Sequence, residues 1–471
     1  MFTSTSSSSS DAESKKIIKK YQEQDGEWAD YQPYEEEEAE RFSTPKWRDT
    51  RAIFALLAVV VAFFVVAFTL TIPENDTGNE DASADTEPTY ETKFESISNG
   101  YWASVFIALS GISLVFAFIW IKIMERYGAE LMNFILIAEI LAFAIFSIIC
   151  LLYKQYVLGG ILIFCTVLCL LLYYMWRSRI PLAAAMLTAV TKVTRKYSAM
   201  SMVALLFGVI VQIAWIMAWS LAAIRAFQIE KNWWTFMCIL CYYWIQEVIL
   251  NIIHVTCASV YGQVFFLNDE MPENPTASAF KKAITYSFGS ICLGSFNVAL
   301  IRTLKRMARM VKGNYAVKIL IFGFIACLEW ITEYFNAYAL VHVAVYGKSY
   351  MKCAKATVRL LKDRGIYALV NDDLVGDVLV MGALISGIIV AIVGFFWAKI
   401  AFDSDLTCMV VFTLIGLFVG IFLTLTVFSV ISSGVMTYYV LFAEAPGALK
   451  HSDPELYNKI VETYNGKYRK D

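Results

Sequence analysis

The chain has 471 residues and a formal net charge of −2, and 58% of its residues are hydrophobic whereas 17% are charged. Water-soluble domains are nearer half apolar and a quarter charged, so this composition excludes that class. No basic, aromatic-interleaved stretch suggests binding to nucleic acid. Apolar runs of about twenty residues recur instead, and this is the length that a helix needs to cross a membrane. We therefore predict an all-α, polytopic transmembrane helical bundle in a lipid bilayer.

Residues 1–51 are polar, with a serine run at Ser6–Ser10 and an acidic run at Glu35–Glu38. Such a composition cannot bury a core, so we expect a disordered cytosolic N-terminal tail. The transmembrane domain is predicted over residues 52–445. A cytosolic C-terminal tail is expected at 446–471.

Ten apolar segments, whose ends are uncertain by several residues, define the predicted topology. In chain order they are Ala52–Ile72, Tyr101–Ile123, Leu131–Leu152, Tyr156–Trp176, Met202–Ile224, Thr235–Ala258, Ile284–Ile301, Ile319–Tyr346, Val378–Ile400 and Cys408–Ser429. Basic residues cluster just before the first span, which places the N-terminus in the cytosol by the positive-inside rule. An even number of spans then places the C-terminus there too.

The segment at 73–100 between the first two spans is acidic and is predicted to be an outer loop. It contains a glycosylation sequon at Asn75. Because Asn75 lies only a few residues from the membrane, we expect that it is not glycosylated.

The fifth and sixth spans carry polar and aromatic residues at helical spacing. In the sixth span Tyr243, Glu247, Asn251 and His254 follow one another at intervals of four, four and three residues, which places them on one helix face. An ionisable group at the centre of a bilayer costs about 2.5–3.5 kcal/mol, so a carboxylate such as Glu247 is expected to be functional or paired. For His254 we favour an interhelical hydrogen bond over a proton relay.

The seventh span combines apolar length with small residues. Ser290 and Gly294 form a small-xxx-small pair, and Gly289 and Ser295 extend the patch. Small side chains let helix backbones approach closely, so we expect this helix to lie centrally against the polar faces of its neighbours. Tight packing without a functional role is the alternative. Asn297 lies on the same helix.

The stretch that follows does not fit the positive-inside rule. Strict alternation of ten spans would place six basic residues outside, namely Arg302, Lys305, Arg306, Arg309, Lys312 and Lys318. A broken or re-entrant segment at 284–318, or a different span count there, would resolve the conflict, and the sequence leaves these alternatives open. Irregular backbone at membrane depth is stable only where protein or a wet cavity surrounds it.

Acids and aromatic rings on neighbouring spans suggest a cavity for a small organic cation. Aromatic faces attract a quaternary ammonium group by about 0.5–2 kcal/mol each, and a carboxylate supplies the counter-charge. We assign the counter-charge to Glu247, with Glu333 of the eighth span next in line. The residues expected to line the site are Trp215, Trp219, Tyr243, Asn251, Ser290 and Asn297.

Two other functions compete with transport. A membrane scaffold or sensor would bind partners through its tail and would have a filled bundle centre. A lipid-modifying membrane enzyme would need acids clustered around a metal at headgroup level. The chain has no GxGxxG, P-loop, HExxH or GxSxG motif, so an enzyme, a metal site and a cofactor are not expected.

Five stretches resemble the choline-transporter-like family, in the order in which that family has them. They are "RSRIPLAAAML" (Arg177–Leu187), "QEVILNIIHV" (Gln246–Val255), "YSFGSICLGS" (Tyr286–Ser295), "EYFNAYALVHVAVYGKSYMKCAKAT" (Glu333–Thr357) and "ALVNDDL" (Ala368–Leu374). The last two are especially similar to the fungal branch, the pH-nine-sensitive proteins. The short loop at 73–100 also resembles that branch.

The resemblance implies a ten-span carrier in the plasma membrane with both termini in the cytosol. It implies transport of choline or a related solute without ATP. It carries over no substrate-binding residues, so the site residues above depend on the polar-face argument.

Overall fold

A computed structural model describes most of the chain. The described ranges are 46–69, 99–177, 179–226, 232–267, 271–310, 315–364, 367–401 and 406–458. Nearly all of the predicted N-terminal tail and outer loop, with the Asn75 sequon, lies outside these residues. The predicted C-terminal tail is described as far as residue 458, and it begins with the short helix α16 (Pro446–Ser452).

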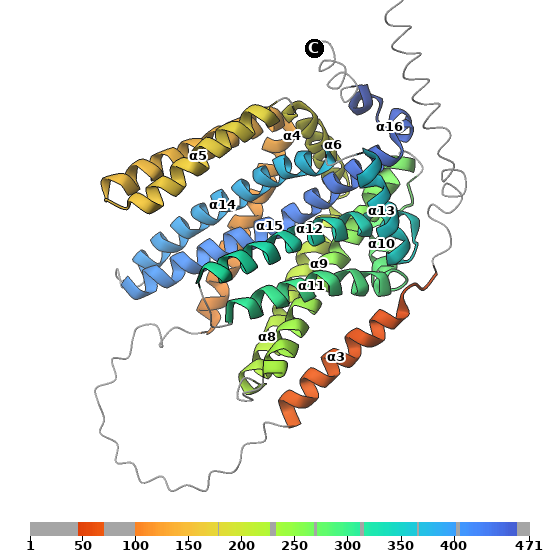
Figure 1. Ribbon diagram of the computed structural model, residues 1–471, viewed down its shortest axis with the longest axis horizontal. Coiled ribbons are helices and arrows are strands. Elements are labelled where there is room, and N and C mark those ends of the chain that lie inside the picture. Colours follow the sequence, from red (N-terminus) through yellow and green to blue (C-terminus); the bar gives the residue numbers. More distant parts are fainter. Residues whose placement is uncertain are drawn as a thin grey trace, which may run out of the picture.

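Every regular element in the described ranges is a helix, and eight of these helices are long and apolar enough to cross a membrane. A bent pair raises that number to nine. The eight lie in α3 (Thr50–Thr69), α4 (Asn99–Leu152), α5 (Tyr156–Trp176), α7–η1–α8 (Ala199–Val203, Ala204–Val209 and Ile210–Ala226), α9 (Asn232–Leu267), α12 (Tyr315–Tyr346), α14 (Tyr367–Ala401) and α15 (Leu406–Glu444). The predicted helical membrane bundle is confirmed (Figure 1).

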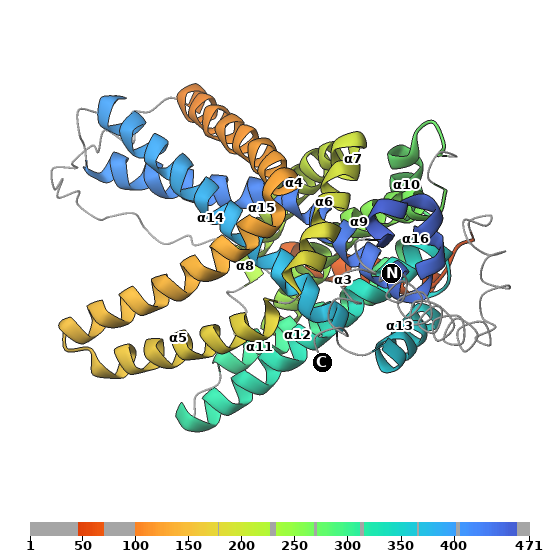
Figure 2. The ribbon, with the colours of Figure 1, turned by 90° about the horizontal axis from the view of Figure 1, so that it is seen from above.

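Helix α4 contains two of the ten predicted spans. It has 54 residues, and its backbone leaves helical geometry at Tyr127, between the predicted spans. A straight helix of that length would extend about 80 Å, far more than the thickness of a bilayer. Figure 2 shows that the two halves of α4 run in different directions from this bend. One continuous helix can therefore supply two crossings.

The predicted break in the 284–318 segment is confirmed at its beginning. Helices α10 (Pro275–Ile284) and α11 (Phe288–Met310) are bent by 67° at the short connection between them. The Thr285 backbone at this connection is not helical, with φ −115° and ψ −88°. The remainder of the predicted span, through Ile301, lies in the regular helix α11.

The corner between α12 and α13 (Tyr350–Arg364) is a second sharp turn at this end of the bundle. Gly347 follows α12 with φ +63°, a left-handed conformation that glycine adopts without steric cost. Lys282 of α10 donates a hydrogen bond to the Ala344 carbonyl in the last turn of α12, at 3.1 Å. A cation at that position interacts favourably with the negative end of the helix dipole.

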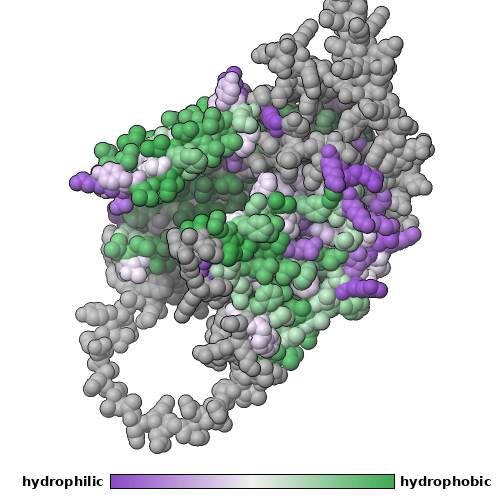
Figure 3. Space-filling view, in the orientation of Figure 1, coloured by the Kyte–Doolittle hydropathy of each residue, from purple (hydrophilic) through white to green (hydrophobic). Residues whose placement is uncertain are grey.

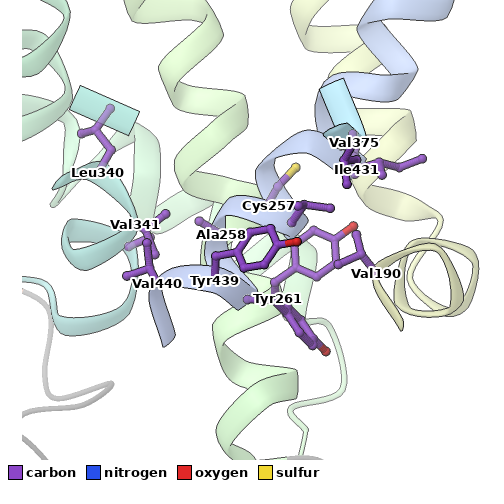
Figure 4. Packing of buried hydrophobic residues seen from close by; sticks show 14 of the residues in the cluster. Val190, Cys257, Ala258, Tyr261, Leu340, Val341, Val375, Ile431, Tyr439 and Val440 are labelled. Atoms are coloured by element: carbon purple, nitrogen blue, oxygen red, sulfur yellow. The ribbon is translucent and has the colours of Figure 1, made fainter. Parts of the chain in front are cut away.

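Helix α9 is the centre of the bundle, packing against α8, α10, α11, α12 and α15. Figure 4 shows its Cys257, Ala258 and Tyr261 among buried side chains of several helices. The fully buried Tyr261 shares a 2.7 Å hydrogen bond with Thr194 of α6 (Ile180–Lys196). Apolar side chains cover much of the outer surface over the α4–α5 hairpin (Figure 3), as expected for helices that face lipid.

Helices α14 and α15 approach most closely at glycines. A Cβ atom on Gly416 would lie 2.6 Å from the Val390 carbonyl oxygen, and one on Gly420 would lie 2.7 Å from the Gly387 Cα. These are backbone atoms, which cannot move aside as a flexible side chain can. The small residues therefore let the two backbones pack directly against each other.

We predict that Gly416→Val destabilises the bundle, because the branched side chain must push α14 and α15 apart. Overpacking of this kind costs about 1–3 kcal/mol. A lower melting temperature of the purified full chain would reveal it. Gly160→Val on α5 is the matched control, because a Cβ there meets no atom within 4 Å. Equal melting temperatures for the two variants would contradict the prediction.

Candidate functional site

The polar face of α9 is buried and bonded to three neighbouring helices. Asn251 donates a 2.9 Å hydrogen bond to Ser295 of α11. The two ring nitrogens of His254 lie 2.9 Å from Ser433 of α15 and 3.1 Å from the Ala337 carbonyl of α12. The prediction that His254 is an interhelical hydrogen-bonding residue is confirmed.

Glu247 continues this face toward a partly buried ionic cluster. Its side chain is 7% exposed and pairs with the Arg302 guanidinium of α11. Arg302 also holds Glu333 of α12, with Nε and Nη2 at 3.0 and 2.7 Å from the same carboxylate oxygen. Glu329 lies 3.6 Å from Arg302 Nε and also pairs with Lys305. One guanidinium thus joins three helices.

We call these five residues the charge cluster: Glu247, Arg302, Lys305, Glu329 and Glu333. It contains three carboxylates and two cations, so one negative charge remains within it. Removing one partner from a buried ion pair costs about 3–5 kcal/mol, because the other charge is left unpaired. This cost applies most directly to Glu247, the most buried member of the cluster.

Glu247, which the sequence assigned as the counter-charge for a substrate cation, is paired with a cation of the protein itself. Arg302 forms an ion pair with Glu247, and it forms another with Glu333, the second candidate for the counter-charge. The pairing also accounts for two of the basic residues that violated the positive-inside rule, because Arg302 and Lys305 point to intramembrane carboxylates. Sequence reasoning missed both cations. The spacing could have predicted Arg302, because it lies seven residues after Ser295 and therefore on the same face of α11. That face contacts the polar face of α9, since Ser295 bonds Asn251.

The two predicted wall tryptophans lie elsewhere. Trp215 donates a 3.4 Å hydrogen bond to the Tyr242 carbonyl, and Trp219 donates a 3.0 Å hydrogen bond to the Cys238 carbonyl. At 100° per residue, Cys238 lies opposite Glu247 on α9. The grouping of Trp215 and Trp219 with Glu247 is therefore wrong, because these rings pack between α3, α8 and the far side of α9.

Trp244 lies on the side of α9 that faces α11. Trp244 is buried, donates a 2.9 Å hydrogen bond to the Cys292 carbonyl of α11, and packs on Phe296 with ring centroids 4.8 Å apart. Tyr243 is half-buried and shares the Glu247 face by its spacing. Trp244 thus faces α11, the helix that also supplies Arg302 to Glu247, and it was not among the predicted site residues.

The small residues of α11 face the chain segment that precedes α3. The Asp49 carboxylate accepts hydrogen bonds from the Ser290 hydroxyl at 2.6 Å and from the Tyr350 backbone N–H at 2.7 Å. A Cβ on Gly289 would lie 2.2 Å from the Arg48 carbonyl oxygen, so only glycine fits there. Ser290 is thus bonded to Asp49 at one end of the bundle, away from the charge cluster.

Gly294 and Asn297 meet the α12–α13 corner. The Tyr350 hydroxyl donates a 3.0 Å hydrogen bond to Asn336 of α12, and a Cβ on Gly294 would overlap that same Asn336 oxygen. Burial raises the pKa of the Tyr350 phenol, and its hydrogen bond with Asn297 opposes the shift. The expectation that this helix packs centrally against polar groups is therefore supported, although Ser290 and Asn297 do not contact Glu247.

Among the described residues, no three His, Cys, Asp or Glu side chains are arranged to hold a metal ion.

Comparison with known proteins decides the family. The family model described as plasma-membrane choline transporter matches residues 160–447, more than half of the chain and all of the charge cluster. The chain belongs to the choline transporter-like family.

Several relatives in this family cover most of the chain. Protein PNS1 of Gibberella zeae is 30% identical over 461 residues, covering 90% of this chain and 84% of its own length. Protein PNS1 of Mycosarcoma maydis is 31% identical and covers 78% of this chain and 75% of its own length. A CTL-like protein of Dictyostelium discoideum is 27% identical, with coverage of 90% and 77%. The predicted resemblance to the fungal branch is confirmed.

We predict that Asp49→Ala loosens the junction of α3, α11 and α13, because two hydrogen bonds to a carboxylate disappear. Bonds to charged groups contribute about 1.5–3 kcal/mol each, so amide exchange near residues 286–291 and 350–353 should accelerate by at least tenfold. Hydrogen–deuterium exchange with mass spectrometry measures this. Asp453→Ala, which removes the carboxylate bonded to the Leu456 N–H, is the control and should leave these peptides unchanged.

Proposed function

We propose that the protein transports choline or a related small organic cation across the plasma membrane, by alternating access and without ATP. Membership of the choline transporter-like family supports a membrane transport role. One structural observation supports a cationic substrate: the charge cluster keeps an excess carboxylate between α9, α11 and α12. Both termini are proposed to lie in the cytosol.

In the proposed transport cycle, Arg302 and the substrate cation take turns in pairing with Glu247. Its guanidinium occupies Glu247 and Glu333 together in this conformation. A substrate cation that reaches Glu247 must compete with it. When the substrate leaves, Arg302 returns and restores its ion pairs, so Glu247 and Glu333 are not left without a cation. The exchange of one cation for another thereby avoids most of the cost of buried charge.

The aromatic side chains placed near Glu247 fit this substrate class. Trp244 and Tyr243 are on or beside the Glu247 face, and an indole attracts a quaternary ammonium group better than other side chains do. We therefore assign Trp244, and not Trp215 or Trp219, to the proposed site. Asn251 completes the polar face, one turn from Glu247.

We predict that Glu247→Gln raises the KM for a transported cation by about 10- to 100-fold, because the amide keeps the shape of the carboxylate but loses its charge. Uptake of radiolabelled choline, ethanolamine and related amines into proteoliposomes measures this. Glu139→Gln on α4 is the matched control, since Glu139 is an intramembrane carboxylate outside the cluster. A wild-type protein that moves none of these amines under any gradient would refute the proposed function and favour a scaffold.

Arg302→Gln should have the opposite effect on KM, because removal of the competing cation leaves Glu247 free for substrate. We expect KM to fall at least threefold while maximal uptake also falls, since the cation that replaces the departing substrate is gone. Arg306→Gln, one residue beyond Lys305, is the control. If Glu247→Gln and Arg302→Gln shift KM in the same direction, the cluster has only a structural role.

A further inference from the structure

Helix α13 has an exposed basic face that the proposed transport site does not use. The helix begins at Tyr350, three residues after α12 ends at Tyr346. Its opposite face is buried against α12 through Cys353 and Thr357, and the Thr357 hydroxyl lies 3.2 Å from the His342 ring. The packing of α13 against α12 therefore leaves the opposite face of α13 exposed.

The open face carries a row of cations at helical spacing. Lys352, Lys355, Arg359 and Lys362 are separated by three, four and three residues and are all exposed. Hydrophilic side chains gather over the part of the surface where α13 lies (Figures 1 and 3). Such a row presents several positive charges to one plane.

Apolar side chains border this row along one edge. Met351 is 57% exposed and Val358 is 40% exposed, and at 100° per residue both lie beside Lys355 and Lys362. A basic stripe with an apolar edge is typical of helices that lie in the membrane interface. A soluble anion would need the charges alone, so the apolar edge favours a lipid surface.

We propose that α13 is a docking surface for anionic lipid headgroups. The three lysines pair with headgroup phosphates or carboxylates, and Met351 and Val358 enter the adjacent acyl boundary. The position of the helix fits this role, because it directly follows the end of a membrane span and therefore lies at headgroup depth.

Lipid bound there would act on the rest of the bundle through Asp49. The Asp49 carboxylate bonds both the first residue of α13 and Ser290 of α11. Helix α11 carries Arg302, so α13 is linked to the charge cluster by one helix. Anionic lipid should thus stabilise the conformation in which α13 is docked on α12.

Purified full-length protein in a zwitterionic detergent provides the test. Phosphatidylserine or phosphatidylcholine is added, and bound lipid is counted by native mass spectrometry while melting is followed by tryptophan fluorescence. We expect phosphatidylserine to bind in preference and to raise the melting temperature. Replacing Lys352, Lys355 and Lys362 by Gln should weaken phosphatidylserine binding about 100-fold, from roughly fivefold per lysine.

Two comparisons make the test decisive. Replacing the same lysines by Arg keeps the charge and should retain binding, which guards against a folding defect in the Gln variant. Replacing Lys154, Lys318 and Lys399 by Gln removes three charges from the other end of the bundle and should change nothing. Neither readout requires transport, so failure here is separate from failure of the proposed function.

The proposal is overturned if both triple Gln variants lose phosphatidylserine equally, or if phosphatidylcholine binds as well as phosphatidylserine. It is also overturned if inorganic phosphate displaces the lipid at equal concentration, because the site would then recognise a free anion.

Discussion

One guanidinium group links three helices of the membrane part of this protein. Arg302 links Glu247 of α9 to Glu333 of α12 from its own place on α11, and Lys305 pairs with Glu329 beside it. Charges in hydrocarbon are tolerated only when partners satisfy them, so these helices are held in one relative arrangement. Any movement of α11 relative to α9 and α12 must break or replace these pairs, and the transport mechanism proposed above assigns that role to a substrate cation.

The opposite end of α11 is fixed by charges of a different kind. Asp49 accepts hydrogen bonds from Ser290 near the start of α11 and from Tyr350 at the start of α13. Lys282 donates to a carbonyl in the last turn of α12. An anion lies where helices begin and a cation where a helix ends, as helix dipoles favour. Helix α11 is thus anchored at its beginning and charged at mid-length, with a 67° bend just before it.

Local sequence patterns predicted much of this fold because lipid imposes strict rules on a chain. Apolar length identified the spans, and small residues identified α11 as a helix of close contacts. The spacing of Glu247, Asn251 and His254 placed them correctly on one face of α9. The sequence grouped Trp215 and Trp219 with Glu247, and the structure does not bring them together. Helical spacing shows which side of its own helix an aromatic residue occupies, but not which side of the neighbouring helix it contacts.

By itself, the sequence determined the class of protein, the helical spans, the break near residue 284 and the family. Each depends on hydropathy, small residues or motifs that act within one segment. Only the tertiary structure decided that Arg302 and Lys305 pair with Glu247, Glu329 and Glu333, that Trp215 and Trp219 contact the far side of α9, and that Asp49 meets Ser290. Those contacts join residues 19 to 241 positions apart, and contacts at such separation follow from helix packing rather than from any local pattern.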